Sequence, residues 1–382
     1  MSRRACLVPA VVAAGLLALP ASAEEPALPA PAPTAVSAAP VSMVPPEAAA
    51  PAVRITLPAW MPSVEIQPGI DVIAGYSLRV TPVETGSAGW FHSFYLERAL
   101  PSLAVRVGPA EVKLAVESVY STTEGALAGV AGDSLLVRIR EARAGYRPTS
   151  WLAFDLGVVP TLVIPTFDQA FGLRALGPVF VEEAGFAAPA DLGVTAKVSF
   201  PRGYGFAAVG GFNGEGYTNR ELNRGKNIEV AALVHPVPRG FLSPLSVFGA
   251  YTNGSSGTGL SRADRVTAAL LWQGDRVRGG VTFTYALGVR DDGGREAYVV
   301  DAYLRGEPIP RFILAARGAV FDRDVRAQED LAVSVTGAVG FRVAPPLEAF
   351  LTLQRSAPES AASSATPGSD FWEGRLLARF AF

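Results

Sequence analysis

Charged side chains in this chain stand at alternate positions of long apolar segments. In residues 111–117, Glu111, Lys113 and Glu117 alternate with aliphatic residues, and in residues 192–200 Lys197 stands among Leu, Val, Ala and Phe. Evenly spaced charges on one face do not bring a nucleophile to its base, nor do they assemble a set of metal ligands. They can instead create an electrostatic field along a polar surface, which attracts ions of opposite charge.

Residues suited to catalysis are few. His92 and His235 are the two histidines, and no serine–carboxylate arrangement is recognisable around either. The single cysteine, Cys6, lies in the first 23 residues, so the rest of the chain has no disulfide, thiol nucleophile or thiolate metal site. We therefore predict no enzyme, no cofactor and no metal. A barrel-shaped lipase or protease that uses one of the histidines is the alternative.

The elements that must position the charges are β-strands. Residues alternate with a period of two, as in Val266, Ala268, Leu270 and Trp272 against Arg265, Thr267 and Gln273. The segments are about ten residues long, which suits a tilted membrane-spanning strand. No run of 18 or more apolar residues follows the N-terminal segment, so the way across a membrane would be a closed antiparallel barrel. A soluble β-sandwich is the alternative; segment length and alternation up to the last residue favour the barrel.

Counting these segments predicts an all-β barrel of about sixteen strands, an even number as in bacterial barrels. The predicted strands are 68–80, 91–107, 110–121, 134–147, 150–159, 191–200, 204–213, 226–236, 243–252, 263–273, 276–287, 296–306, 311–321, 331–343, 347–356 and 372–382. Short turns alternate with long loops, the latter including 160–190 and 288–295. Pro101 interrupts the second strand, and a bulge near it would rescue the alternation.

The N-terminus predicts export. Residues 1–23 have the pattern of a signal peptide: Arg3 and Arg4, a short apolar stretch, and Ala21-Ser22-Ala23 as the cleavage site. Residues 24–63 are rich in Pro and Ala, which predicts a disordered periplasmic tether. Residues 64–382 would form the barrel. The net charge of −2 argues against a nucleic-acid partner, since such proteins usually carry a strong basic excess.

The C-terminus resembles the terminal strand by which the barrel-assembly machinery recognises outer-membrane proteins. The residues that carry this resemblance are Leu376, Ala378, Phe380 and Phe382, with Arg375 and Arg379 on the other face. The resemblance implies that the chain reaches the cell outer membrane of a Gram-negative bacterium. Outer-membrane lipids and lipopolysaccharide would then be its surroundings.

Two internal stretches resemble the phosphate-selective porin O/P family. One is Gly211-Phe212-Asn213-Gly214-Glu215-Gly216-Tyr217 with Asn223, Lys226-Asn227 and Pro236; the other is Arg140-Glu141-Ala142-Arg143-Ala144-Gly145-Tyr146-Arg147-Pro148 leading to Asp155-Leu156-Gly157. The resemblance implies a sixteen-stranded porin, with a homotrimer as a further expectation. Phosphate-selective members use clustered lysines, whereas this chain has only Lys113, Lys197 and Lys226, so phosphate selectivity is not carried over.

The loop 160–189 is the candidate pore constriction. In sixteen-stranded porins the loop after the fifth strand folds into the barrel, and a long loop of this kind is usually functional. Its polar residues are Asp168, Gln169, Arg174, Glu182 and Glu183, set among Phe, Leu and Pro. The alternative is an external cap that touches lipopolysaccharide.

Strand parity predicts a basic lumen. The basic residues that it places inside are Arg79, Lys113, Arg138, Arg140, Lys197, Arg265, Arg276, Arg278, Arg305, Arg311, Arg317, Arg342, Arg375 and Arg379, against eight acids. We therefore predict an outer-membrane porin for passive diffusion of small hydrophilic solutes or ions, with a weak anion preference carried by Arg174, Arg138, Arg140, Arg317 and Arg379. These arginines could equally brace one another and the loop. A plugged or narrow barrel with a binding, adhesion or structural role is the alternative function.

Overall fold

The structure is a computed structural model, described here for residues 53–55, 63–81, 89–120, 135–218, 224–257, 259–289, 292–328, 330–358 and 370–382. The chain divides into two units, Met1–Ala39 and Pro40–Phe382, and all described residues belong to the second. The predicted signal peptide and most of the predicted tether lie outside the described residues.

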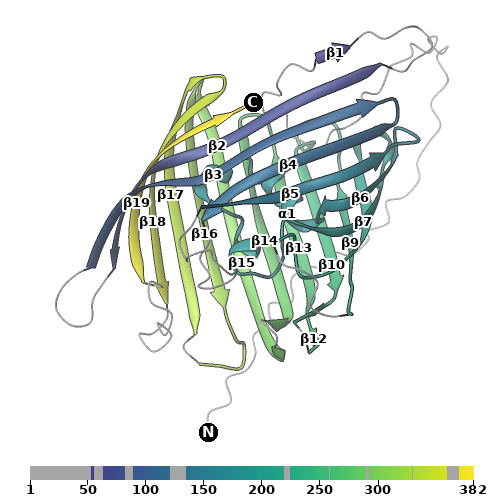
Figure 1. Cartoon of the computed structure of the whole chain (residues 1–382). Helices are drawn as coiled ribbons and strands as arrows, with labels where there is room; N and C mark the ends of the chain where they lie inside the picture. Colours follow the sequence, from purple (N-terminus) through teal and green to yellow (C-terminus); the bar gives the residue numbers. More distant parts are fainter. Residues whose placement is uncertain are drawn as a thin grey trace, which may run out of the picture. The chain divides into compact units, whose positions relative to one another are not determined.

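Sixteen antiparallel strands form a closed ring, which confirms the predicted barrel (Figure 1). They are β2 (Val64–Thr81), β3 (Gly89–Val107), β4 (Ala110–Tyr120), β5 (Leu135–Tyr146), β6 (Leu152–Pro160), β7 (Ala190–Ser199), β8 (Gly205–Phe212), β9 (Asn227–Val234), β10 (Leu245–Asn253), β13 (Asp264–Gln273), β14 (Val277–Val289), β15 (Asp292–Ile309), β16 (Phe312–Asp322), β17 (Leu331–Ala344), β18 (Leu347–Pro358) and β19 (Phe371–Ala381). Each strand pairs with its sequence neighbour, and β19 closes the ring on β2.

Three further strands lie outside the ring. β1 (Val53–Ile55), within the segment predicted as tether, pairs with Val64–Ile66 of β2, beyond the point where β19 ends. β11 (Ser255–Ser256) and β12 (Ser261–Arg262) form a small hairpin in the loop after β10. The predicted loop 288–295 is shorter than expected, because β14 continues to Val289 and β15 already begins at Asp292. No helix in the described part of the chain is long and apolar enough to span a membrane.

The outer and inner faces of the wall differ as the alternation predicts. On β13, Leu270 is exposed on the outer face, whereas Ala269 and Leu271 are buried on the inner face. An apolar outer face suits a hydrocarbon surrounding, where the backbone groups of a closed barrel are all paired. The inner face is less polar than expected, since Phe248, Leu271 and Phe350 also point inward and are buried.

Two β-bulges change which side chains face inward. In the β2–β3 ladder, Ile73 pairs with Arg98 and Ala74 with Leu96, so Glu97 is an extra residue. In the β4–β5 ladder, Ala115 pairs with Glu141 and Val116 with Ile139, so Arg140 is an extra residue. A bulge leaves one residue unpaired and shifts the parity of the strand beyond it. The second strand therefore has the expected bulge, but at Glu97 rather than at Pro101, which remains paired with Ile70.

Candidate functional site: the inner loop of the barrel

Residues 161–189, between β6 and β7, form the candidate site and are called the inner loop below. They contain α1 (Val163–Phe171), the 3-10 helix η1 (Arg174–Leu176) and α2 (Phe180–Glu183), where the sequence suggested an irregular loop. The amide of Leu162, just before α1, donates to the Glu229 carboxylate of β9 at 3.1 Å. α1 ends at Gly172, whose φ of 64° is a conformation that favours glycine. The Gly172 amide closes the last turn on the Asp168 carbonyl at 2.8 Å.

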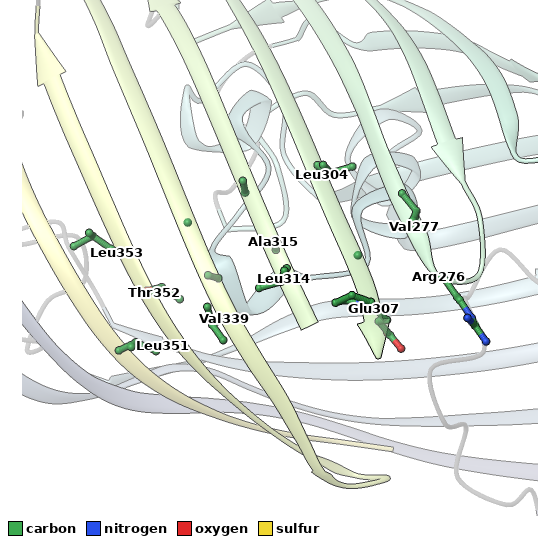
Figure 2. A pocket seen from close by; sticks show the side chains of 15 residues that line it. Arg276, Val277, Leu304, Glu307, Leu314, Ala315, Val339, Leu351, Thr352 and Leu353 are labelled. Carbon is green, nitrogen blue, oxygen red and sulfur yellow. The ribbon is translucent and has the colours of Figure 1, made fainter. Parts of the chain in front are cut away.

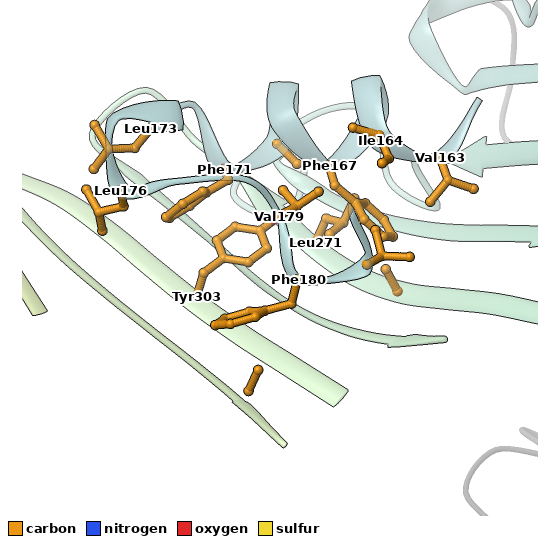
Figure 3. Close-up of a cluster of buried hydrophobic side chains, with 14 of the residues drawn as sticks. Val163, Ile164, Phe167, Phe171, Leu173, Leu176, Val179, Phe180, Leu271 and Tyr303 are labelled. Atoms are coloured by element: carbon orange, nitrogen blue, oxygen red, sulfur yellow. The ribbon is translucent and has the colours of Figure 1, made fainter. Parts of the chain in front are cut away.

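Apolar packing fixes the inner loop to the wall, as Figure 3 shows for the buried side chains around Tyr303. The Phe167 ring meets Phe248 of β10 edge-on, with ring centroids 5.3 Å apart. The Phe171 ring lies 4.8 Å from that of Tyr303 on β15. The amphipathic α1 thus places its apolar side against the apolar part of the inner wall. This explains why part of the inner wall is lined by apolar side chains such as Phe248 and Leu271.

Four wall arginines also hold the inner loop, and each donates to a backbone carbonyl of it. Arg265 donates to Phe186 O at 3.0 Å, Arg278 to Gln169 O at 3.4 Å, Arg375 to Leu176 O at 3.2 Å, and Arg317 to Pro178 O. Gly172 lies so close to Arg278 that a Cβ there would stand 2.5 Å from its Nη1. These arginines therefore hold the loop in place. A backbone carbonyl carries no net charge, so it does not neutralise the guanidinium that donates to it.

The predicted loop charges form pairs. Arg174 contacts Asp168 at 2.9 Å and Glu182 at 2.7 Å. Burial opposes the charge of Arg174, but these two carboxylates hold its pKa above the usual value. Glu183 lies 3.5 Å from Arg317, and its side chain is more exposed than those of Asp168 and Glu182. Partial burial inside the barrel raises the pKa of Glu183.

A second charged cluster lines the wall formed by β2–β5. Arg140 contacts Glu117 at 3.0 Å, and the Tyr217 hydroxyl donates to the same carboxylate at 2.6 Å. Tyr217 belongs to the loop after β8; burial and the neighbouring Glu117 raise its pKa to about 12. Arg98 lies 3.4 Å from Glu117 and 3.6 Å from Asp71. Nearly every charge in this cluster therefore has an opposite partner.

Sequence parity missed Arg98 and Arg143 as lumen residues. Both lie beyond a bulge, at Glu97 and at Arg140, and the shifted parity turns them inward. Arg143 contacts Glu111 at 2.8 Å and also Asp155. Only the bulge in β3 could be inferred from the sequence, because there the alternation of apolar residues shifts by one position around Pro101.

The other predicted lumen residues vary in their partners. Arg379 pairs with Asp71 at 2.9 Å across the β19–β2 closure. Lys197 lies over the Phe206 ring at 4.3 Å, and Arg138 makes no ion pair with any described residue. Arg276 departs from the prediction: it lies beyond the end of its strand and lines a hollow on the outer wall.

The predicted assembly residues occupy the last strand. Leu376, Ala378 and Phe380 are exposed on its outer face, and the Phe380 and Phe382 rings lie 5.6 Å apart. Backbone hydrogen bonds of 3.1 Å in both directions join Phe382 to Ile70. The terminal residue thus completes the closure with β2.

The two histidines do not form a recognisable catalytic arrangement among the described residues. His92 accepts or donates a 2.7 Å hydrogen bond with the Tyr76 hydroxyl and stacks on Trp90. His235 has a buried Nδ1 without a described hydrogen-bond partner. Within the same described ranges, no group of three His, Cys, Asp or Glu side chains could hold a metal ion.

No family model matches the chain, and the comparison with curated proteins finds no match. Among solved structures, OmpF of Salmonella typhi in complex with daunomycin aligns with a TM-score of 0.61 at 12% identity, over 83% of this chain and 98% of that chain. The anion-selective porin from Comamonas acidovorans aligns with a TM-score of 0.56 at 13% identity, over 83% and 100% of the two chains. The outer membrane channel DcaP of Acinetobacter baumannii aligns with a TM-score of 0.52 at 10% identity, over 84% of this chain and 97% of that chain.

At these identities the likeness shows the fold. The chain has a porin-like barrel, and the expectation of a porin-type architecture is confirmed at that level. The finer resemblance to phosphate-selective porins gains no support from a family match.

Proposed function

We propose that this chain is an outer-membrane channel through which small hydrophilic solutes and ions diffuse passively. The observation that carries the proposal is the combination of a closed sixteen-stranded wall, apolar outside, with a charged lumen into which the inner loop folds. In this proposal the inner loop is the constriction, and Arg174, Asp168, Gln169, Glu182 and Glu183 lie at or beside the narrowest part. The predicted export signal at residues 1–23 and the terminal strand support the proposal that the assembly machinery inserts the chain into the outer membrane.

We further propose a weak anion preference, although most of the carriers that strand parity suggested are neutralised by carboxylates. Arg140, Arg379 and Arg174 each contact carboxylates, so little of their field reaches a passing ion. Arg278 and Arg375 donate to carbonyls or hydroxyls and make no ion pair with a described carboxylate, so more of their charge acts on the lumen. Screening over about 8 Å at physiological salt keeps this anion preference weak.

The test is conductance in a planar bilayer, followed by reversal potentials across a low-salt gradient. We expect steady current and a potential of the sign that anions produce. Replacing Arg278 and Arg375 with Gln should bring the anion-to-cation permeability ratio close to one. Replacing both with Lys is the matched control: it keeps the charge and should keep the preference. A cation preference in the wild type, or the same loss with Lys, would contradict the proposed carriers.

A plugged barrel with a binding or structural role is the second candidate. The observation that favours it is the close filling of the lumen: Phe167, Glu117 and Arg140 are all buried. Absence of current at any voltage, with folded protein in the bilayer, would establish this candidate and exclude the channel. A homotrimer in detergent remains part of the proposal, and light scattering measures it directly.

A further inference from the structure

The outer wall carries a hollow that the channel function does not use. It has a volume of about 790 Å³ and lies across β14–β18 near the end where the short turns are (Figure 2). Exposed aliphatic side chains wall it, among them Leu304, Leu314, Val339 and Leu351. Its floor includes Gly306 and Gly337, where an added Cβ would meet nothing within 4 Å. Small-molecule sites span about 300–1,000 Å³, so the hollow is large enough for part of a lipid chain.

Two arginines stand at the turn end of the hollow. Arg276 precedes β14 and lines the hollow, and in Figure 2 its side chain points beyond the strand ends. Arg311 lies in the neighbouring β15–β16 turn and is exposed. Neither side chain pairs with a described residue. Asp275, in the same turn as Arg276, offsets part of this charge.

Glu307 also lines the hollow, but its charge is already neutralised. Its carboxylate accepts hydrogen bonds from Arg305 at 2.7 Å and from Arg342 at 3.1 Å. The turn end of the hollow therefore has surplus positive charge directly below an apolar surface.

We infer that this hollow binds an anionic phospholipid of the leaflet that surrounds the short turns. One acyl chain fills the space above Gly337, and the phosphate lies between Arg276 and Arg311. Guanidinium groups bind phosphate through paired hydrogen bonds, and the aliphatic wall matches an acyl chain. The inference rests on the proposed location of the barrel in a membrane.

Charge complementarity selects this occupant over a second copy of the chain. The outer wall of a second copy could cover the aliphatic part of the hollow. It would also have to place an anionic group at the level of the turns, opposite Arg276 and Arg311. A phospholipid places its phosphate at that level while its chain runs along the wall. The two occupants also differ in what a cysteine placed in the hollow would contact.

The test uses the full chain in phosphatidylcholine vesicles with spin-labelled phosphatidylglycerol or spin-labelled phosphatidylcholine as the probe. We expect the wild type to retain phosphatidylglycerol at least about fivefold more strongly, since one arginine near the surface contributes about 1 kcal/mol. Arg276→Gln with Arg311→Gln should reduce this preference to near one. Arg202→Gln with Arg239→Gln removes two exposed arginines from other connections of the barrel and should leave the preference unchanged.

A second pair of variants tests the apolar part. Gly337→Phe fills the hollow and should lower retention of phosphatidylglycerol. Gly249→Phe is its matched control, because Gly249 is exposed on the outer face of β10, away from the hollow, and a Cβ there also meets nothing within 4 Å.

Three results would overturn the site: no preference in the wild type, an equal loss in the Arg202/Arg239 control, or cross-linking between copies through Gly337→Cys in a chain with Cys6→Ser. Conductance measured on the same vesicles separates the two proposals. Current without a lipid preference refutes only the lipid site, whereas a lipid preference without current refutes only the channel.

Discussion

Replacing Phe167 with Ala should release the inner loop more effectively than removing any one of the arginines that hold it. The Phe167 side chain is 1% exposed and packs edge-on against Phe248. Truncating a buried Phe to Ala costs about 3–5 kcal/mol. Loss of a single hydrogen bond from a charged group, such as that from Arg278 to Gln169 O, costs about 1.5–3 kcal/mol. The apolar contact is therefore the stronger anchor.

These energies set the size of the expected change. A loss of 3–5 kcal/mol raises the ratio of released to docked loop by about 10² to about 4 × 10³, since about 1.4 kcal/mol is a factor of ten. Limited trypsin digestion measures this ratio, because cleavage after Arg174 requires a released loop and follows its population when reclosing is fast. The rate of appearance of a peptide ending at Arg174 should rise by the same factor, and open-channel noise should increase.

The matched control is Phe94→Ala, which removes an aromatic ring that is 85% exposed on the outer wall. It should leave both cleavage after Arg174 and channel noise unchanged. Equal cleavage rates in Phe167→Ala and the wild type would refute the conclusion that apolar packing anchors the loop. A larger effect from Arg278→Gln would show that the arginines are the main anchor.

Three further outcomes are expected. Arg174→Gln leaves two loop carboxylates without their cation, so reversal potentials should shift toward cations by about twofold in permeability ratio. Because the pKa of Glu183 is raised, its carboxylate takes up a proton at a higher pH than an ordinary Glu. The anion preference should therefore increase as the pH falls through this pKa. In a pH series of reversal potentials, Glu183→Gln should abolish that change. Tyr217→Phe removes the hydroxyl that donates to Glu117, and the thermal unfolding midpoint should fall by the equivalent of about 1–3 kcal/mol, with unchanged migration of the folded barrel on gels.

The strand count and nearly all strand positions could be predicted from the amino-acid sequence. Alternation with a period of two is a local property, and each short turn, such as Gly108-Pro109, marks a strand end without reference to the rest of the chain. The length and position of the inner loop were equally visible. Its helices were not predicted, because nine apolar-rich residues after a Pro give no clear helical signal on their own.

Which charges act on the lumen and which are neutralised depends on how the chain packs in three dimensions. Arg98 and Arg143 face inward because of bulges whose exact place alternation does not fix. Arg379 meets Asp71 only when the last strand closes on the first, and Arg278 meets Gln169 O only when the loop enters the barrel. Strand parity reports the side of the wall on which a residue stands. The partner that a lumen residue meets depends on barrel closure, strand register and loop packing, because these bring together residues that are far apart in the chain.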